Sequence, residues 1–329
     1  MKISKAISYL NTFSEKKQAC FFIIDYELQN PQVWKISDIP HDIRISFPHF
    51  SCNNKTLFEE FDGNPISHIT PILFDEYERA FTRAQKYISR GDTFLLNLTV
   101  SNHIELVTDD LSEIFHIASA PYKLCYKNQF VVFSPEPFIS IRNNQIFTYP
   151  MKGTIDASLK NAENILLGNT KEQAEHATTV DLLRNDMSFV AENVRLTKYR
   201  YIDKIHTPSH SILQMSSCIQ GDIRKDLKSQ LGTILFSMLP AGSICGAPKQ
   251  KTLEIIHSVE THTRGYYTGI MGYFDGENLE TAVMIRFIEK QDENIVYKSG
   301  GGITFQSNVH EEYDEIVKKI YVPITSRNN

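Results

Sequence analysis

The sequence predicts an α+β fold, in which antiparallel strands form the sheets and helices surround them. Residues 130–150 alternate like two strands around a turn at Asn143-Asn144, and residues 267–304 have the pattern of a meander. Helical periodicity occurs between and after these stretches, in residues 171–186, 248–260 and 309–320. Strand pairs joined by tight turns, with helices set between them, favour this class over a parallel βαβ arrangement.

The first 74 residues differ from the rest of the chain in their pattern. Prolines interrupt any long helix there, so short strands and loops are expected. From Asp75, which is placed to cap a helix, the pattern becomes helical as far as a stop at Gly91. The apolar face of that helix consists of Tyr77, Phe81, Ala84 and Ile88. We therefore expect a small N-terminal portion, 1–74, packed on one main domain, 75–325.

Composition argues against several classes of protein. The net charge is -5 and no run of Lys or Arg forms a basic tail, which is unlike a nucleic-acid-binding protein. Five cysteines occur without a CxxC pair, so neither a disulfide framework nor a zinc site is expected. The N-terminus lacks a signal-peptide pattern, and no apolar stretch approaches the roughly 20 residues of a membrane span. These features predict a cytoplasmic protein that does not associate with membranes.

Four glutamates occur as two pairs with the same helical spacing. Glu172 and Glu175 are three residues apart in one predicted helix, and Glu312 and Glu315 repeat that spacing in the last one. Side chains at this spacing project from one face of a helix. If both faces meet at one cleft, the carboxylates repel one another unless a cation intervenes, and Mg²⁺ is the simplest choice. Taken by itself, the spacing fits solvated helix faces better than a metal site.

Two glycine-rich segments and one arginine have features of anion binding. Gly300-Gly301-Gly302 follows a predicted strand, and successive glycines let backbone N–H groups approach an anion. Residues 241–249, which include Ser243, lead into the N-terminus of a predicted helix. Ordinary tight turns explain each segment better when it is taken singly. Arg286 lies in the apolar strand 281–288 and needs a carboxylate, either from a ligand or from an internal ion pair.

Lys152 follows another predicted strand, within Pro150-Met151-Lys152-Gly153-Thr154. An exposed lysine is the usual interpretation of such a position. A desolvated lysine beside other cations is the alternative, and such an amine can act as a nucleophile.

Taken together, the motifs resemble those of the chorismate-utilising enzymes. The resemblance covers about residues 75 to 322, and the motifs follow the family's order. The matching segments are Gly91-Asp92-Thr93-Phe94, Ser134-Pro135-Glu136, 150–154, Glu175-His176, 180–186, 246–249, 264–269, Ile285-Arg286, 300–302 and 312–315. Each motif alone is weakly specific, whereas the ordered set is highly specific.

The resemblance implies a single large chorismate-binding fold, with orthogonally packed antiparallel sheets wrapped by helices and a cleft between them. It implies Mg²⁺ as the cofactor, engaging the ring carboxylate of chorismate, while an arginine and a glycine backbone hold the enolpyruvyl carboxylate. The implied metal ligands are Glu172, Glu175, Glu312 and Glu315. The implied substrate contacts are Arg286, Tyr267, Gly300, Gly301, Gly302, Ser243 and Gln214.

Lys152 narrows the resemblance to the aminodeoxychorismate synthases, component I. The family's anthranilate synthases typically carry alanine at this position, whereas the aminodeoxychorismate synthases carry lysine. The resemblance implies that the amine attacks the ring at C2, that the C4 hydroxyl leaves, and that ammonia then displaces the lysine. Glu136 would protonate the departing hydroxyl. The implied reaction converts chorismate and ammonia to 4-amino-4-deoxychorismate, in p-aminobenzoate and folate biosynthesis.

Two positions depart from the family's pattern. Leu95 stands where relatives usually carry glutamine, or lysine in those that activate water, so an isochorismate synthase is not expected. Gln214 stands where many relatives have a histidine, and glutamine cannot shuttle protons near neutral pH. His210 is the histidine best placed to compensate. These departures leave open a catalytically silent chorismate-binding subunit. Anthranilate synthase component I is the alternative among enzymes, and Lys152 argues against it.

The source of nitrogen is expected to lie outside the chain. The sequence contains no convincing Cys-His-Glu set of an amidotransferase. The expected partners are therefore chorismate, ammonia and a separate glutamine amidotransferase subunit.

Overall fold

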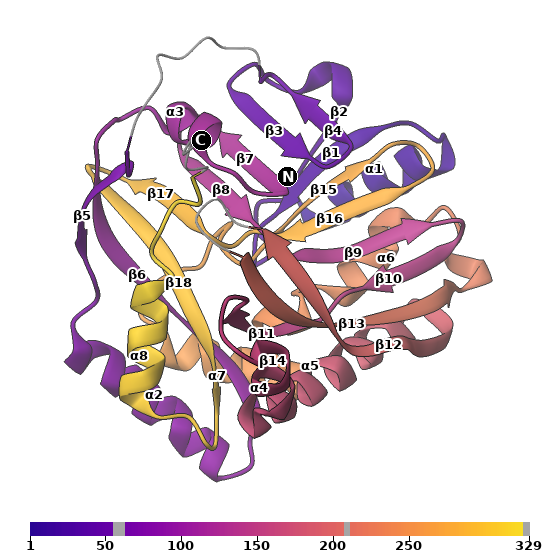
Figure 1. Ribbon diagram of the computed structural model, residues 1–329. Helices are drawn as coiled ribbons and strands as arrows, with labels where there is room; N and C mark the ends of the chain where they lie inside the picture. Colours follow the sequence, from indigo (N-terminus) through magenta and orange to yellow (C-terminus); the bar gives the residue numbers. More distant parts are fainter. Residues whose placement is uncertain (55–62, 207–210, 325–329) are drawn as a thin grey trace.

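Two antiparallel sheets of nine strands each form the centre of the computed structural model, which describes residues 1–54, 63–206 and 211–324. Helices lie on the outer sides of the sheets (Figure 1). This arrangement confirms the predicted α+β class, in which helices surround antiparallel sheets. In the described part of the chain, none of the helices is long and apolar enough to span a membrane.

The first sheet combines strands from the N-terminal, middle and later parts of the chain. Its order is β11-β13-β10-β9-β16-β15-β1-β2, with β12 paired to β13. The bounds are β1 Cys20–Ile24, β2 Gln32–Lys35, β9 Pro137–Arg142, β10 Gln145–Thr148, β11 Met151–Asp156, β12 Ala191–His206, β13 Ser211–Ile223, β15 Ile270–Phe274 and β16 Leu279–Val283.

The second sheet is equally mixed in sequence. Its order is β14-β6-β18-β17-β8-β7-β3-β4, with β5 paired to β6. The bounds are β3 Ile43–Phe47, β4 Phe50–Cys52, β5 Ile66–Thr70, β6 Leu95–Leu106, β7 Tyr122–Tyr126, β8 Phe130–Ser134, β14 Gly246–Ala247, β17 Phe287–Gln291 and β18 Asn294–Thr304.

The helices fall into groups that cover different parts of the sheets. Those packed in the core of the first sheet are α1 Ile3–Glu15, α5 Thr170–Ser188 and α6 Leu231–Met238. Those packed on β6 and β18 of the second sheet are α2 Phe74–Ser89, α7 Lys249–Val259 and α8 Val309–Lys318. The remaining two are α3 Leu111–Ile117, on β7 and β8, and α4 Ala162–Gly168, beside β11. Short 3-10 turns occupy Ile36–Asp38, Lys225–Leu227 and Gly242–Ile244.

Strand β1 shows how the two sheets share one core. All five of its residues are buried, because it is covered on both faces. Phe22 and Ile24 pack toward the helices of the first sheet, while Phe21 and Ile23 join a cluster with residues of the second sheet such as Phe287. The N-terminal residues therefore contribute a buried strand that lies between β15 and β2, next to the edge of the first sheet.

Helix α2 confirms the clearest helical prediction. Its four predicted apolar residues are all buried against β6, α7 and α8. Gly91, with φ of 79°, follows its C-terminus as expected. The predicted cap is wrong, because Leu73 is the N-cap and Asp75 lies in the first turn.

Helix α1 was not predicted, and the expectation of only strands and loops before residue 74 is wrong. The proline-free start of the chain forms 13 residues of helix, and Ala6, Leu10 and Phe13 are its buried face. Its N-cap, Lys2, makes no side-chain capping bond, so the usual start signal is missing.

The predicted meander in residues 267–304 is divided between the two sheets. Strands β15 and β16 pair in the first sheet, whereas β17 and β18 pair in the second. The chain crosses from one sheet to the other in residues 284–286. Arg286 therefore lies between strands rather than within one, and its φ of 55° is a left-handed conformation uncommon for arginine.

Four further site residues, in two strands, occupy positions that differ from the expected ones. Gly300, Gly301 and Gly302 lie inside β18, paired with Thr99, Leu98 and Asn97 of β6, rather than in a turn after a strand. Lys152 lies inside β11, next to a bulge at Gly153, where φ is 74°.

Candidate active site

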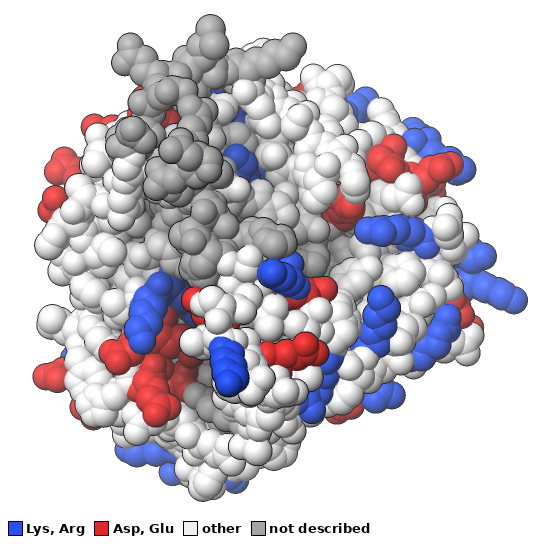
Figure 2. All heavy atoms as spheres, viewed as in Figure 1, with Lys and Arg blue, Asp and Glu red and all other residues white. Residues whose placement is uncertain are grey.

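A cavity of about 580 Å³ lies beside the point where the chain crosses between the sheets. Its wall comes from β11, β18, α5, α8 and the connections before β9 and β17. The structure brings every site residue predicted from the sequence to this wall. They are Glu136, Lys152, Glu172, Glu175, Gln214, Ser243, Tyr267, Arg286, Gly300, Gly301, Gly302, Glu312 and Glu315. On the molecular surface, acidic side chains gather over α8 with basic ones beside them (Figure 2).

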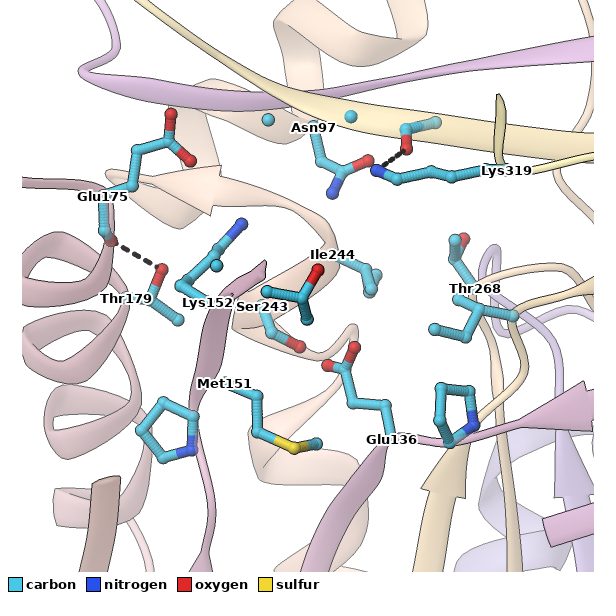
Figure 3. Close-up of a pocket in the computed structure, with 18 of the residues that line it drawn as sticks. Asn97, Glu136, Met151, Lys152, Glu175, Thr179, Ser243, Ile244, Thr268 and Lys319 are labelled. Carbon is cyan, nitrogen blue, oxygen red and sulfur yellow. Dashed lines mark hydrogen bonds between the residues drawn. The ribbon is translucent and has the colours of Figure 1, made fainter. Parts of the chain in front are cut away.

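The two glutamate pairs reach the cavity from two capped helices. The side chain of Asn169 accepts a hydrogen bond from the N–H of Glu172 at the start of α5, and Asn308 caps α8 in the same way. One glutamate of each pair is buried, since Glu175 is 9% exposed and Glu312 is 2% exposed, whereas Glu315 remains exposed. Figure 3 shows Glu175 pointing into the cavity.

Glycines give the carboxylates room. A Cβ atom added at Gly153 would lie 3.0 Å from a carboxylate oxygen of Glu172. One added at Gly301 would lie 3.6 Å from Glu312 and 4.0 Å from Glu315. A side chain at Gly153 would therefore crowd Glu172, whereas one at Gly301 would meet the glutamates of α8 at ordinary van der Waals distance.

The donor chemistry of this wall fits a hard divalent cation. Carboxylate oxygens are the protein ligands that Mg²⁺ uses, generally one or two of them with water and substrate completing the shell. Within the described residues, no three acidic, histidine or cysteine side chains converge as a ready-made metal cluster. The glutamates would thus supply ligands from two sides, and a bound ion would need water or substrate oxygens as well.

Arg286 lies in the cavity wall without an internal carboxylate partner. Its Nε is buried and has no hydrogen-bond partner, and no ion pair joins it to another residue of the described chain. Its carbonyl accepts the N–H of Phe133 at 3.1 Å, which fixes the crossing. The geometry therefore favours a ligand carboxylate over an internal ion pair as the partner of Arg286.

Lys152 extends into the same space. Its amine would lie 3.6 Å from a Cβ atom placed on Gly302, and it forms no ion pair or hydrogen bond with another described residue. Figure 3 places the amine between Glu175 and Asn97, on the side of the cavity opposite Thr268. The side chain is therefore inside the cavity and not on the outer surface.

Glu136 faces Lys152 and Ser243 across the floor of the cavity (Figure 3). Burial raises the pKa of its carboxyl, while Lys152 and a hydrogen bond from Ser243 act in the opposite direction. Its N–H donates to the Ser134 hydroxyl at 3.1 Å, and its carbonyl accepts from Val283. A carboxyl held in this way keeps its proton to higher pH than an ordinary glutamate and can serve as an acid.

The edge of β18 is open beside these groups. β17 pairs with β18 only up to Lys298, and from Ser299 to Thr304 the paired neighbour is β6. The carbonyl of Gly300 therefore accepts a hydrogen bond from Lys319 instead of from a strand, at 2.9 Å. Backbone groups on this side of the glycines remain accessible to a ligand.

Sequence reasoning missed two polar residues of the wall. Lys319 pairs with Glu315 at 2.7 Å, and its spacing of four residues on α8 was the available signal. Asn97 points into the cavity from β6 (Figure 3), opposite Gly302 in the strand pairing. Nothing in the strand's alternation distinguishes Asn97 from a residue on a solvated face.

The two departures from the family pattern have different surroundings. Leu95 is 4% exposed, is not part of the cavity wall and packs beside Gly302. Gln214 lies in the wall from β13, paired with Thr154 of β11. His210 lies outside the described residues.

Other motif residues hold the wall in place rather than entering the cavity. Lys249 pairs with buried Asp186 at 2.7 Å and also donates to the carbonyl of Met238. Arg264, 1% exposed, binds both carboxylate oxygens of Glu260 and donates to the backbone carbonyls of Asn97 and Ile244. We call three ion pairs the frame: Lys249–Asp186, Arg264–Glu260 and Lys298–Glu289.

The fold and the cavity define a protein that binds a small anionic substrate with a cluster of acidic and basic side chains. The sequence profile of the family described as chorismate binding enzyme matches residues 12–325, and the chain belongs to that family.

Three relatives show the range of the family. An uncharacterized PabA-like protein of Pasteurella multocida is 46% identical and covers 98% of this chain and 100% of its own length. Aminodeoxychorismate synthase component 1 of Bacillus subtilis is 31% identical over 78% of this chain and 56% of its own length. The crystal structure of anthranilate synthase component I from Streptococcus pneumoniae superposes with a TM-score of 0.67 at 26% identity, covering 80% of this chain and 60% of that one.

Proposed function

We propose that this enzyme is an aminodeoxychorismate synthase component I, which replaces the C4 hydroxyl of chorismate by an amino group. The observation that carries the proposal is the amine of Lys152 inside the cavity, which has no ion-pair partner among the described residues and lies opposite Glu136, whose carboxyl pKa is raised by burial. The resemblance in sequence to the Bacillus subtilis protein supports it.

Chorismate carries two carboxylates, and the cavity offers two places for them. Arg286, with Tyr267 and the open edge of Gly300–Gly302, would bind the enolpyruvyl carboxylate. The ring carboxylate would face the two glutamate pairs. Glu175 and Glu315, with Glu172 and Glu312 close by or acting through water, would hold Mg²⁺ there, and the ion would supply charge compensation and Lewis acidity.

The lysine amine would form a covalent intermediate. The unprotonated amine attacks C2, the ring double bonds shift, and the C4–O bond breaks as Glu136 donates a proton, so that water leaves. Ammonia then forms a bond to C4, the double bonds shift back, and the C2–N bond breaks to release the amine. The new ammonium group returns one proton to Glu136, which closes the cycle.

Ammonia would reach the cavity from solution or from a partner. None of the free cysteines of the described chain lies in the cavity wall, so this site offers no thiolate for glutamine hydrolysis. A separate glutamine amidotransferase subunit is the partner that this chemistry calls for.

Anthranilate synthase component I is the second candidate, and the similarity to the solved Streptococcus pneumoniae structure favours it. That reaction places nitrogen at C2, where an amine from the protein would stand in the way of ammonia. Lys152 therefore distinguishes the two candidates.

The test is incubation of the protein with chorismate, Mg²⁺ and ammonium chloride, followed by chromatographic separation of para- from ortho-amino products. We expect 4-amino-4-deoxychorismate, and none when ammonium is omitted or the metal is removed with EDTA. Anthranilate as the main product would replace the proposal by the second candidate. Binding of chorismate without any amino product would indicate a catalytically silent subunit.

A further inference from the structure

The last residues of the described chain form an extended strap at one end of the cavity. Beyond α8, residues 319–324 run past α3, where Ile324 bridges to Ala118 and the N–H of Ser119 donates to the Pro323 carbonyl at 2.6 Å. Ile320 and Val322 are each 5% exposed and pack in the core beneath α3. We call residues 319–324 the C-terminal strap.

The alternation of this strap leaves Tyr321 on the cavity side. Side chains alternate along an extended chain, so Tyr321 points away from the core that Ile320 and Val322 enter. Its side chain lines the cavity and is 44% exposed. Its carbonyl accepts a hydrogen bond at 3.0 Å from the hydroxyl of Tyr297, a residue of β18 that is 1% exposed. The buried core therefore fixes the position of Tyr321.

The ring of Tyr321 lies against Arg286. The guanidinium carbon is 5.2 Å from the ring centroid, which is within the range of a cation–π contact. The Tyr321 side chain is also a hydrogen-bond partner of the guanidinium. The buried Nε of Arg286 has no hydrogen-bond partner, so at least one donor is unused by the protein. A guanidinium that one side chain holds while its Nε donor stays unused is suited to bind a carboxylate.

We propose that Tyr321 is a positioning residue, whose ring holds the guanidinium of Arg286 in the orientation that binds a substrate carboxylate. The inference rests on the proposed function, in which Arg286 takes one carboxylate of chorismate. The C-terminal strap then contributes two residues to the active site. Lys319 pairs with Glu315 and donates to the carbonyl of Gly300, while Tyr321 supports Arg286.

The experiment measures chorismate binding by calorimetry in the presence of Mg²⁺, together with KM, kcat and the thermal unfolding temperature, for Tyr321→Leu and Tyr321→Phe. Tyr9→Leu is the matched control. Tyr9 lies on α1, is 41% exposed, and makes a similar cation–π contact, with the amine of Lys5 at 5.3 Å from its ring centroid. We expect Tyr321→Leu to raise Kd and KM about tenfold with little change in kcat, because it removes both a partly exposed cation–π contact and a hydrogen bond. Tyr321→Phe keeps the ring and should have a clearly smaller effect, and Tyr9→Leu should bind as the unchanged protein does.

Arg286→Ala separates this inference from the proposed function. If Arg286→Ala binds chorismate as tightly as the unchanged protein, the proposed function is wrong. If Arg286→Ala binds weakly while Tyr321→Leu binds normally, only the positioning role is wrong. A loss in Tyr321→Phe as large as that in Tyr321→Leu would also overturn the role of the ring. In the double variant, the effect of Tyr321→Leu should disappear, because it acts through the arginine.

Discussion

Basic side chains that are buried or partly buried occupy two contrasting regions of this molecule. In the frame, Lys249, Arg264 and Lys298 each pair with a carboxylate at 2.7 Å. In the cavity, Lys152 and Arg286 have no such partner among the described residues. Even partial removal of a charge from water has a cost when the charge has no partner, so stability alone gives no reason for the cavity cations. The ion pairs of the frame therefore hold the wall together, whereas Lys152 and Arg286 are available to bind a ligand.

The largest effect is expected at Lys152. Lys152→Ala should lower the rate of amination by at least about a thousandfold, because it removes the nucleophile of the covalent step. Lys152→Arg keeps the charge without a comparable nucleophile, and it should be as slow while still binding chorismate. The measurement is kcat with ammonium, alongside the calorimetric Kd. A rate in Lys152→Arg near that of the unchanged protein would remove the nucleophilic role.

Substitutions in the frame should lower the free energy of unfolding, whereas substitutions of the cavity cations should change it little. Glu260→Ala leaves Arg264 buried without its carboxylate and should lower the free energy of unfolding by about 3–5 kcal/mol. Arg286→Ala removes a cation that has no internal partner and should change it by less than about 1 kcal/mol. Denaturant unfolding of both variants checks this. Equal losses would show that Arg286 is as structural as the frame.

The glutamates of the cavity should control the metal dependence. Glu315→Gln is expected to raise the Mg²⁺ concentration needed for half-maximal rate by about 10–100-fold, the scale seen when metal-site residues are replaced. Glu254→Gln is the matched control, because Glu254 also pairs with a lysine, at 2.8 Å, on the exposed surface of α7. An unchanged metal requirement in Glu315→Gln would contradict the ligand assignment.

A smaller effect on stability is expected at low pH, through His262, which interacts with the frame residue Glu260. Burial lowers the pKa of His262 to about 4, against about 6.5 in an unfolded chain, with Glu260 acting in the opposite direction. Between these values the unfolded state binds the extra proton, so stability falls as pH decreases, by at most about 1.4 kcal/mol per pH unit. His262→Gln should show a shallower decline than the unchanged protein, and the exposed His68→Gln should not. Identical pH profiles for all three proteins would refute the contribution.

Much of this architecture could be predicted from local pattern. Tight turns such as Asn143-Asn144, at φ of 52° and 59°, and amphipathic helices such as α2 carry their own signals. The division of residues 267–304 between two sheets carries none, because strands of both sheets have the same alternation. Helix α1 lacked a capping side chain, so its start could not be recognised.

The site was predictable where ordered motifs mark it. The glutamate pairs, Lys152 and Arg286 all reach one cavity, although Arg286 does so from a crossing and not from a strand. Asn97 and Tyr321 carry no motif, since their roles depend on which face of an extended segment meets the cavity. That choice is made by tertiary packing, as in the burial of Ile320 and Val322 on either side of Tyr321.

The most direct test is whether the amine of Lys152, a cavity cation without a partner in the frame, forms a covalent bond to the substrate. The measurement is the intact mass of the protein after it is mixed with chorismate and Mg²⁺ in the absence of ammonium. We expect a covalent adduct with the mass of chorismate less one water, which maps to the peptide containing Lys152 and disappears when ammonium is added. Formation of the amino product at the full rate without any adduct on Lys152, and unchanged in Lys152→Ala, would contradict it.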